Sequence, residues 1–140
     1  MTENYKIIGS FIKDMSSETP DTPTYIFVRD KISKYRLNIN INSKAVKNGI
    51  IEVDTIIKFS DQPEVLKKAH FEITYTSIVK VDKKVSDKKE MEKIILCDVP
   101  NKIYPDLERI FLSLLTDSGY PGIKFEKKID FTELYKQRAN

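Results

Sequence analysis

Hydrophobic and polar residues alternate over most of the first eighty residues of the chain. In residues 34–42 the apolar side chains occupy odd positions, and Lys, Arg or Asn occupy even ones. Similar alternation recurs in three other segments: residues 5–16, 50–60 and 65–81. It is weakest in the first, where Tyr5, Ile7 and Phe11 share the odd side. A period of two is typical of strands with one buried and one solvated face, so the pattern predicts a four-stranded antiparallel sheet.

The connections between these segments carry turn signals. Asn48-Gly49 is typical of a tight hairpin, and Asp61-Gln62-Pro63 separates the next pair of strands. Residues 19–25 contain two prolines, which favour an extended loop or crossover because proline cannot donate to a strand ladder. The predicted sheet is therefore a four-stranded meander entered through one irregular segment.

After the last strand the spacing of apolar residues becomes helical. Ser86 is placed to cap a helix that begins at Asp87, and Pro100 is expected to end or kink it. A second helix is predicted from about 102 to 118, with Gly119 as its C-terminal stop. A short extended piece and a short C-terminal helix complete the chain.

A single domain is expected, because 140 residues suffice for one sizeable core. Residues 1–81 would form the sheet, residues 86–118 the helical region, and residues 119–140 the extended piece and last helix. The predicted class is α+β, with one face of the sheet covered by the long helix and the short C-terminal helix.

The long helix carries more apolar surface than one sheet face requires. At ~100° per residue, its apolar positions cover an arc much wider than the stripe of roughly 100° that one face needs. The short C-terminal helix is one way to cover the surplus, and another copy of the chain is a second. The residues predicted for such an oligomer interface are Ile103, Leu107, Ile110, Phe111, Leu112, Leu114 and Leu115.

Composition narrows the functional classes. The chain is 40% apolar and 32% charged with a formal net charge of +3, which is too weakly basic to indicate a nucleic-acid partner. It lacks the long apolar run of a membrane span and shows no secretory signal. Cys97 is the single cysteine, which excludes an internal disulfide and favours the cytoplasm. We expect no cofactor, and one His and one Cys are too few for a structural metal site.

Three motifs resemble those of one protein family. They are FIKDMSSETPDTP, VPNKIYP and GYPGIKFEKKIDFTELYKQ, in this order and at the family's distances. The first shares six positions with the family pattern: Lys13, Asp14, Ser16, Glu18, Pro20 and Pro23. Ser17 stands where an aromatic residue is usual, and Lys128 stands where a proline is common. The chain resembles SecB, the bacterial protein-export chaperone, from about residue 7 to 136.

This resemblance implies a function and an assembly. SecB-like proteins are not enzymes; they hold unfolded secretory precursors without ATP and pass them to the motor SecA. They are homotetramers, dimers of dimers, whose main helices lie between two outer sheets. The family is usually acidic, whereas this chain is slightly basic.

The resemblance also implies two binding surfaces. Acidic residues on the exposed sheet of the family bind a basic, zinc-bearing tail of SecA, and the matching positions here are Asp14, Glu18 and Glu72. Clustered carboxylates attract Lys and Arg at a strength that salt reduces. Scattered acids on a solvated strand face are the alternative interpretation. His70 lies beside Glu72 with no Ser or Cys nucleophile near it in the pattern, so catalysis is not indicated.

A surface for unfolded clients should be apolar, long and adaptable, with exposed strand edges. The resemblance places it at residues of the Pro-rich crossover and the C-terminal region: Tyr25, Phe27, Val28, Tyr120, Ile123, Phe125, Phe131, Leu134 and Tyr135. Ordinary core packing is the alternative for most of them.

Two other functions remain open. A SecB-like chaperone of a toxin–antitoxin system would bind one antitoxin selectively. A small α+β enzyme or ligand-binding domain would need a closed pocket with convergent polar groups, which the pattern does not show.

Overall fold

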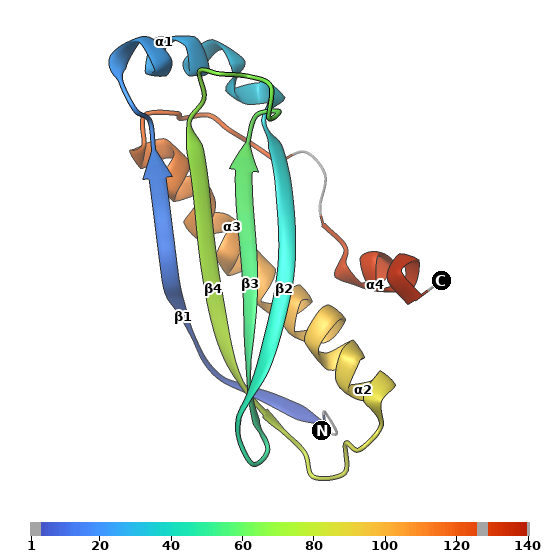
Figure 1. Ribbon diagram of the computed structural model, residues 1–140. Coiled ribbons are helices and arrows are strands. Elements are labelled where there is room, and N and C mark those ends of the chain that lie inside the picture. Colours follow the sequence, from blue (N-terminus) through green and yellow to red (C-terminus); the bar gives the residue numbers. More distant parts are fainter. Residues whose placement is uncertain (1–3, 126–128, 140) are drawn as a thin grey trace.

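The computed structural model describes residues 4–125 and 129–139. The strands in this part of the chain are β1 (Tyr5–Glu18), β2 (Arg36–Lys47), β3 (Ile50–Ser60) and β4 (His70–Val81). The α-helices are α1 (Thr22–Lys31), α2 (Lys88–Lys93), α3 (Val99–Asp117) and α4 (Phe131–Ala139). A 3-10 turn (Ile32–Lys34) follows α1, and a π-helical stretch (Ile94–Asp98) joins α2 to α3. The sheet forms one layer, and α3 runs diagonally behind it (Figure 1).

The predicted four-stranded antiparallel sheet with a long and a short helix is confirmed. β2, β3 and β4 form the consecutive meander, and Gly49 turns the β2–β3 hairpin with a φ of 74°. β1 lies beside β4, so the strand order is β1-β4-β3-β2 and the connection after β1 crosses the end of the sheet. This order leaves β1 and β2 as the two edge strands.

β1 changes which side its residues face, because its register shifts between Ile7 and Gly9 and again between Ile12 and Asp14. Residues directly opposite each other in an antiparallel pair point to the same side. Ile7 pairs with buried Val79 and faces the helix, as expected. Phe11 pairs with Thr76 on the other face and is 47% exposed, so the prediction that it shares the side of Ile7 is wrong.

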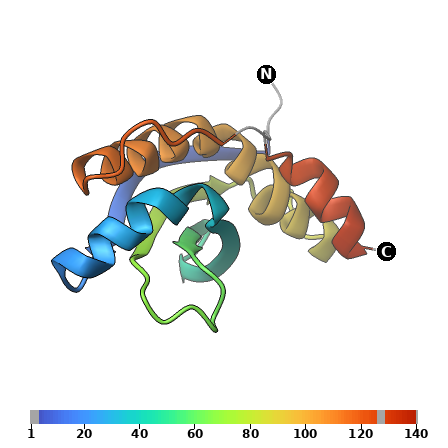
Figure 2. The same ribbon diagram turned by 90° about the horizontal axis from the view of Figure 1, so that it is seen from above.

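The core lies between the sheet and α3, which spans one face when the molecule is seen from above (Figure 2). Leu107, Phe111 and Leu115 of α3 are fully buried against the inward side chains of β3 and β4, such as Phe59 and Phe71. Burying such a side chain stabilises the fold by about 1.5–3 kcal/mol. This row therefore fixes α3 on the sheet.

The helical region is more continuous than the sequence predicts. Asp87, not Ser86, caps α2, and its side chain accepts a hydrogen bond from the Lys89 N–H at 3.1 Å. Pro100 does not end the helix, because a π-helical stretch precedes it and the Val99 N–H bonds to the Ile94 carbonyl five residues back. Such a widened turn accommodates a break in the usual bonding ladder.

The Pro-rich crossover is also helical rather than an extended loop. Asp21 caps α1 by accepting a hydrogen bond from the Thr24 N–H at 2.8 Å, and Pro23 lies in the first turn. Proline is well tolerated there, because the first N–H groups of a helix have no partner within it. At the same end of the fold, Gly119 ends α3 as predicted, with a φ of 102°. A Cβ at Gly119 would lie 2.9 Å from the Tyr25 ring, so this close contact also needs glycine.

The structure divides the predicted oligomer interface into two sets. Ile103, Leu107, Phe111 and Leu115 are buried inside the protomer, so they cannot offer surface to another copy. This part of the prediction is corrected, because these side chains are the ones that face the sheet. The half-buried members are Ile110, Leu112 and Leu114, and only these keep surface for a partner.

Candidate functional site

Two hollows follow each other on the helix side of the sheet, one just before the start of edge strand β2 and one beside its middle. The larger, of about 520 Å³, is lined by residues that include Tyr35, Phe59, Ile123 and Phe125. The smaller, of about 180 Å³, is lined by residues of β2 and α4 with Leu96. We call the two hollows together the β2 trough.

The trough exists because β2 has a strand on only one side. Its inward residues Leu37, Ile39 and Ile41 remain half-buried, whereas the matching positions of β3 and β4 are fully covered. α4 stands beside β2 and apart from the sheet layer, so it forms an outer wall (Figure 1). An edge strand bordered by apolar side chains is suited to an extended, apolar polypeptide.

α4 is held in place at its first turn. The Asn101 side chain of α3 accepts a hydrogen bond from the Phe131 N–H at 3.2 Å and donates to Thr132 Oγ1 at 3.0 Å. Asp130 caps the helix by accepting from the Thr132 N–H at 2.9 Å. Cys97 is buried, as predicted, and its Sγ lies 3.1 Å from Thr132 Oγ1. The trough is therefore bounded by a helix that is fixed at one end.

Five of the predicted client residues line the β2 trough: Ile123, Phe125, Phe131, Leu134 and Tyr135. Phe131 is nevertheless only 1% exposed, whereas Leu134 is 48% exposed and accessible. The structure thus brings the C-terminal set together.

The other four predicted client residues lie elsewhere. Val28 and Tyr120 are buried in the core, so they are corrected to structural residues. Tyr25 donates a hydrogen bond from its hydroxyl to the Gly119 carbonyl at 2.8 Å and anchors α1 to the end of α3. Phe27 is exposed on α1, not on a loop, and lines neither hollow.

Sequence reasoning missed several trough residues: Ile32, Tyr35, Ile39, Ile41, Phe59 and Leu96. The alternation in residues 34–42 had already assigned Ile39 and Ile41 to one side of a strand. The alternation does not indicate that this strand lies at an edge of the sheet, because its edge position depends on the strand with which the first strand pairs.

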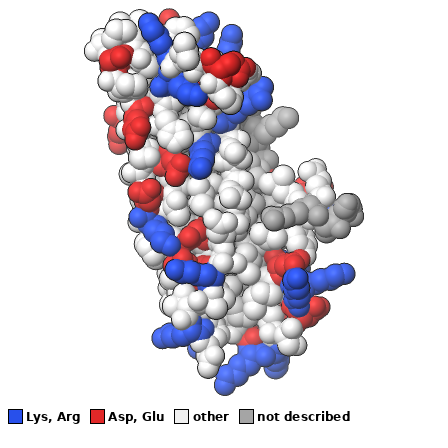
Figure 3. Space-filling view, in the orientation of Figure 1, with Lys and Arg blue, Asp and Glu red and all other residues white. Residues whose placement is uncertain are grey.

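The predicted acidic residues do share one region on the face of the sheet away from α3. Asp14 pairs with Thr74, Ser16 with Glu72, and Glu18 with His70, so the three carboxylates occupy successive rows at the β1 edge. Asp14 and Glu18 are exposed and make no ion pair within the described residues. Glu72 is partly neutralised, since its Oε1 lies 3.8 Å from Lys58 Nζ and 3.4 Å from His70 Nε2. Figure 3 shows acidic side chains along this edge.

A lysine occupies the centre of the same face. Lys13 Nζ lies 2.9 Å from Glu52 Oε2 and 3.4 Å from Asp54 Oδ2. The hydrogen bond to Glu52, with the charge of Asp54, raises the pKa of Lys13. This lysine therefore compensates the acids of β3, and Asp14 and Glu18 remain the uncompensated carboxylates of the face.

The rest of the described chain adds no catalytic arrangement to this picture. Within residues 4–125 and 129–139 no group of His, Cys, Asp and Glu has the spacing of a metal site, and no helix is long and apolar enough to cross a membrane. Burial, assisted by the charge of Glu108, raises the pKa of Tyr104 to about 12, so this phenol is neutral at physiological pH.

A comparison with solved structures finds a similar fold. The chain is similar to a SecB-like chaperone of Mycobacterium tuberculosis, solved in complex with a peptide of the HigA1 antitoxin. The TM-score is 0.65 with 13% sequence identity, and the match covers 89% of this chain and 91% of the other. At this identity the match shows a shared fold.

The sequence comparisons identify the family. A family model described as "Preprotein translocase subunit SecB" matches residues 1–140, and the chain belongs to the SecB family. A curated relative from Pelagibacter ubique, which has the name "Putative protein-export protein SecB", is 94% identical over the full length of both chains. A protein-export protein SecB of Methylocella silvestris is 24% identical, with 93% of this chain and 79% of the relative covered.

Proposed function

We propose that the protein is a cytoplasmic, ATP-independent holdase that keeps unfolded secretory precursors competent for export and delivers them to SecA. The observation that carries the proposal is the β2 trough in a chain of the SecB family. A client segment would lie extended along β2 and place apolar side chains in the two hollows. The role is one of binding, without catalysis or a cofactor.

The trough suits many different sequences. Most of its lining side chains are aromatic or aliphatic, and Leu134 of α4 is accessible from solvent at 48% exposure. Contacts of this kind are not directional, so they select for hydrophobic content rather than for a particular sequence. A holdase that serves many precursors needs this breadth.

The proposal predicts that the protein, without nucleotide, slows the refolding of an unfolded secretory precursor severalfold at one assembly per client. Leu134→Glu should weaken client binding about tenfold, because a charge then meets the apolar segment in the smaller hollow. The half-time of refolding and the client affinity, measured by fluorescence anisotropy, check these two expectations.

Gln137→Glu is the matched control, since Gln137 is an exposed residue of the same helix and gains the same charge. Its client affinity should stay within about twofold of the wild type. An absence of any refolding delay would reject the holdase role. Equal losses in both variants would reject the trough as the binding surface.

Handover to SecA would use the acidic rows at the β1 edge. Asp14 and Glu18 lie on the face opposite α3, away from the trough, so the proposed client and motor surfaces would be separate on one protomer. Charge attraction between these carboxylates and a basic SecA segment speeds encounter and weakens with salt.

Asp14→Ala should therefore lower SecA affinity about threefold to tenfold at low salt, and leave client affinity unchanged. Asp106→Ala, which removes an exposed acid from α3, is the control and should have little effect. Isothermal titration with SecA at two salt concentrations gives the measurement. An unaltered SecA affinity for the Asp14 variant at low salt would exclude this site.

The same surfaces also suit an antitoxin-specific chaperone, because the mycobacterial structural neighbour was solved with an antitoxin peptide. The export role is favoured by the 94% identical relative, which carries the protein-export name. Affinities for several unrelated unfolded precursors separate the two: comparable affinities support export, and strong selectivity for one antitoxin supports the alternative.

A further inference from the structure

One end of the molecule is rich in lysine. The β2–β3 hairpin, the start of β1 and the end of β4 meet there and bring together five lysines, which we call the lysine end: Lys6, Lys47, Lys80, Lys83 and Lys84. All five side chains are exposed. Neither the family motifs nor the client and SecA surfaces involve them.

Three of these lysines lie on one row of the sheet. Lys6 pairs directly with Lys80, Lys80 with Ile50 on its other side, and Ile50 with Lys47. Directly paired residues have Cβ atoms about 5 Å apart on the same face, and like charges so placed destabilise the pair. The repulsion between the paired lysines remains in the folded protein, and an anion bound at the row would remove it.

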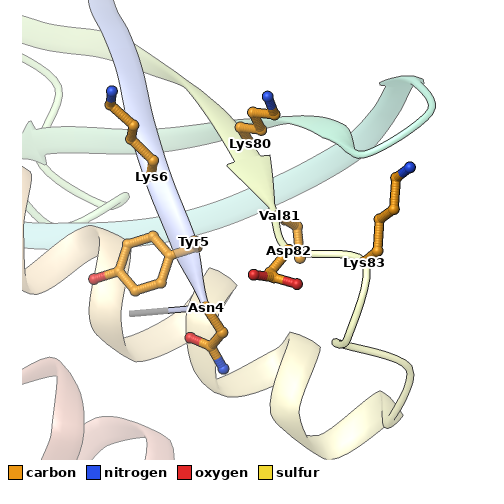
Figure 4. Close-up of a pocket in the computed structure, with 7 residues that line it drawn as sticks. All are labelled: Asn4, Tyr5, Lys6, Lys80, Val81, Asp82 and Lys83. Carbon is orange, nitrogen blue, oxygen red and sulfur yellow. The ribbon is translucent and has the colours of Figure 1, made fainter. Parts of the chain in front are cut away.

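The close-up in Figure 4 shows that the ammonium groups of Lys6, Lys80 and Lys83 extend to the same side. They border an open hollow of about 350 Å³. None of the three has an ion-pair partner among the described residues. The one acid in the hollow, Asp82, accepts a hydrogen bond from the Lys84 N–H at 2.9 Å within the turn.

The lysine end is one of the clusters of positive charge on the surface. The formal net charge of the whole chain is +3, which is less than the five lysines contribute alone, so the remaining residues carry a slight excess of acid. Basic side chains appear at the lower end in Figure 3 and also at the upper end, and Asp14 and Glu18 lie several rows from the lysine end on the same face. The acidic rows therefore lie away from the lysine end along the strands.

An apolar residue projects from the same end. Val46 is the extra residue where the β2–β3 register shifts between Ala45 and Lys47, and it is 53% exposed. Two features argue against a nucleic-acid partner. An exposed valine gains little from contact with a nucleic-acid backbone. The lysine end also contains no arginine, the residue suited to bidentate phosphate contacts. A diffuse row of lysines with a shallow apolar tip matches a lipid–water interface instead.

We propose that the lysine end docks the protein on an anionic phospholipid surface. The lysine row would lie over the headgroups, Val46 would enter the interface, and the acidic rows would stand away from the negative membrane. Docking requires no client, so this inference can fail while the holdase role holds, and the reverse is also possible.

The test is flotation of the full-length protein with vesicles of phosphatidylcholine alone or with one third phosphatidylglycerol. We expect binding only to the anionic vesicles at 50 mM salt, and its loss at 500 mM salt. The triple variant Lys6→Gln/Lys47→Gln/Lys80→Gln should bind at least tenfold more weakly, because each lysine near such a surface is worth roughly fivefold. Val46→Ser should lower binding a few-fold at every salt concentration.

The matched control is Arg29→Gln/Lys34→Gln/Lys67→Gln, which removes three exposed basic side chains from other parts of the surface, none of which lines the β2 trough. It should keep vesicle binding within about twofold, and both triple variants should slow precursor refolding as the wild type does. Wild-type protein that fails to float with anionic vesicles would overturn the proposal. Equal losses in both triple variants would also overturn it, as would tighter binding to a short RNA than to the vesicles at equal salt.

Discussion

Phe111→Ala should lower the free energy of unfolding by about 3–5 kcal/mol. Phe111 is 0% exposed, and its ring centroid lies 6.0 Å from that of Phe59 and 6.2 Å from that of Phe125. Truncation removes the transfer energy of the ring and leaves a cavity that neighbours held by the sheet and α3 fill only in part. Equilibrium urea unfolding at one fixed protein concentration measures the change.

The consequence reaches the proposed client surface. Phe125 lines the larger hollow and stacks on Phe111, so Phe111→Ala removes the support of one trough wall. Client affinity should fall even where the variant is still fully folded. The support for the trough therefore comes from the helix layer as well as from β2.

Phe27→Ala is the control for this variant, because it deletes the same ring from a residue that is 39% exposed on α1. Its loss should stay below about 1 kcal/mol. Phe111→Leu should retain more than half of the stability that Phe111→Ala loses, since most of the apolar volume remains. Similar losses for Phe111→Ala and Phe27→Ala would contradict the placement of Phe111 at the centre of the core.

The sheet was predictable because its evidence is local. Residues 34–42 alternate strictly, and β2 keeps that alternation with Leu37, Ile39 and Ile41 on one side. β1 alternates poorly for a reason that the structure supplies: the register shift between Ile7 and Gly9 moves Phe11 to the outer face, and a second shift follows between Ile12 and Asp14. A bulge leaves a weak signature in a single sequence, because it adds only one residue to one strand.

The helices around Pro23 and Pro100 were mispredicted because proline was treated only as a residue that interrupts helices. Asp21 followed by Pro23 is also a helix-start signal, and α1 uses it in that sense. The sequence predicts that Pro100 ends or kinks a helix, and the π-helical stretch before it lets the chain continue into α3. Local sequence alone does not decide between these outcomes, since tertiary packing against the sheet contributes to the choice.

The candidate site was only partly predictable, because some of its residues are close together in the sequence and others are distant. The C-terminal motif kept Phe125, Leu134 and Tyr135 close in sequence, and they line the trough. The strand that completes the trough is almost a hundred residues away in the chain. Its role follows from the strand order, in which β1 pairs with β4 and leaves β2 as an edge. Such long-range pairing is not encoded in any one segment.

Leu112 is the residue on which the proposed assembly can be tested most directly. It lies roughly 140° around α3 from Leu107, which faces the sheet. Leu112 is half-buried, whereas Leu107 is fully buried, so Leu112 retains surface that a second copy would cover. A homotetramer with its main helices between two sheets places this side of α3 in the interface. A charge at Leu112 would then be buried without a partner on every protomer.

Leu112→Glu should therefore weaken subunit association by at least about thirtyfold, since truncation or charging of an interface centre typically costs 2 kcal/mol or more. Analytical ultracentrifugation at micromolar concentration should show a tetramer for the wild type and smaller species for the variant. Ser113→Glu, at an exposed neighbouring position, should leave the tetramer intact. A wild-type monomer in the same experiment would mean that residues 119–125 and α4 already cover the helix. The trough would then have to hold clients within a single protomer.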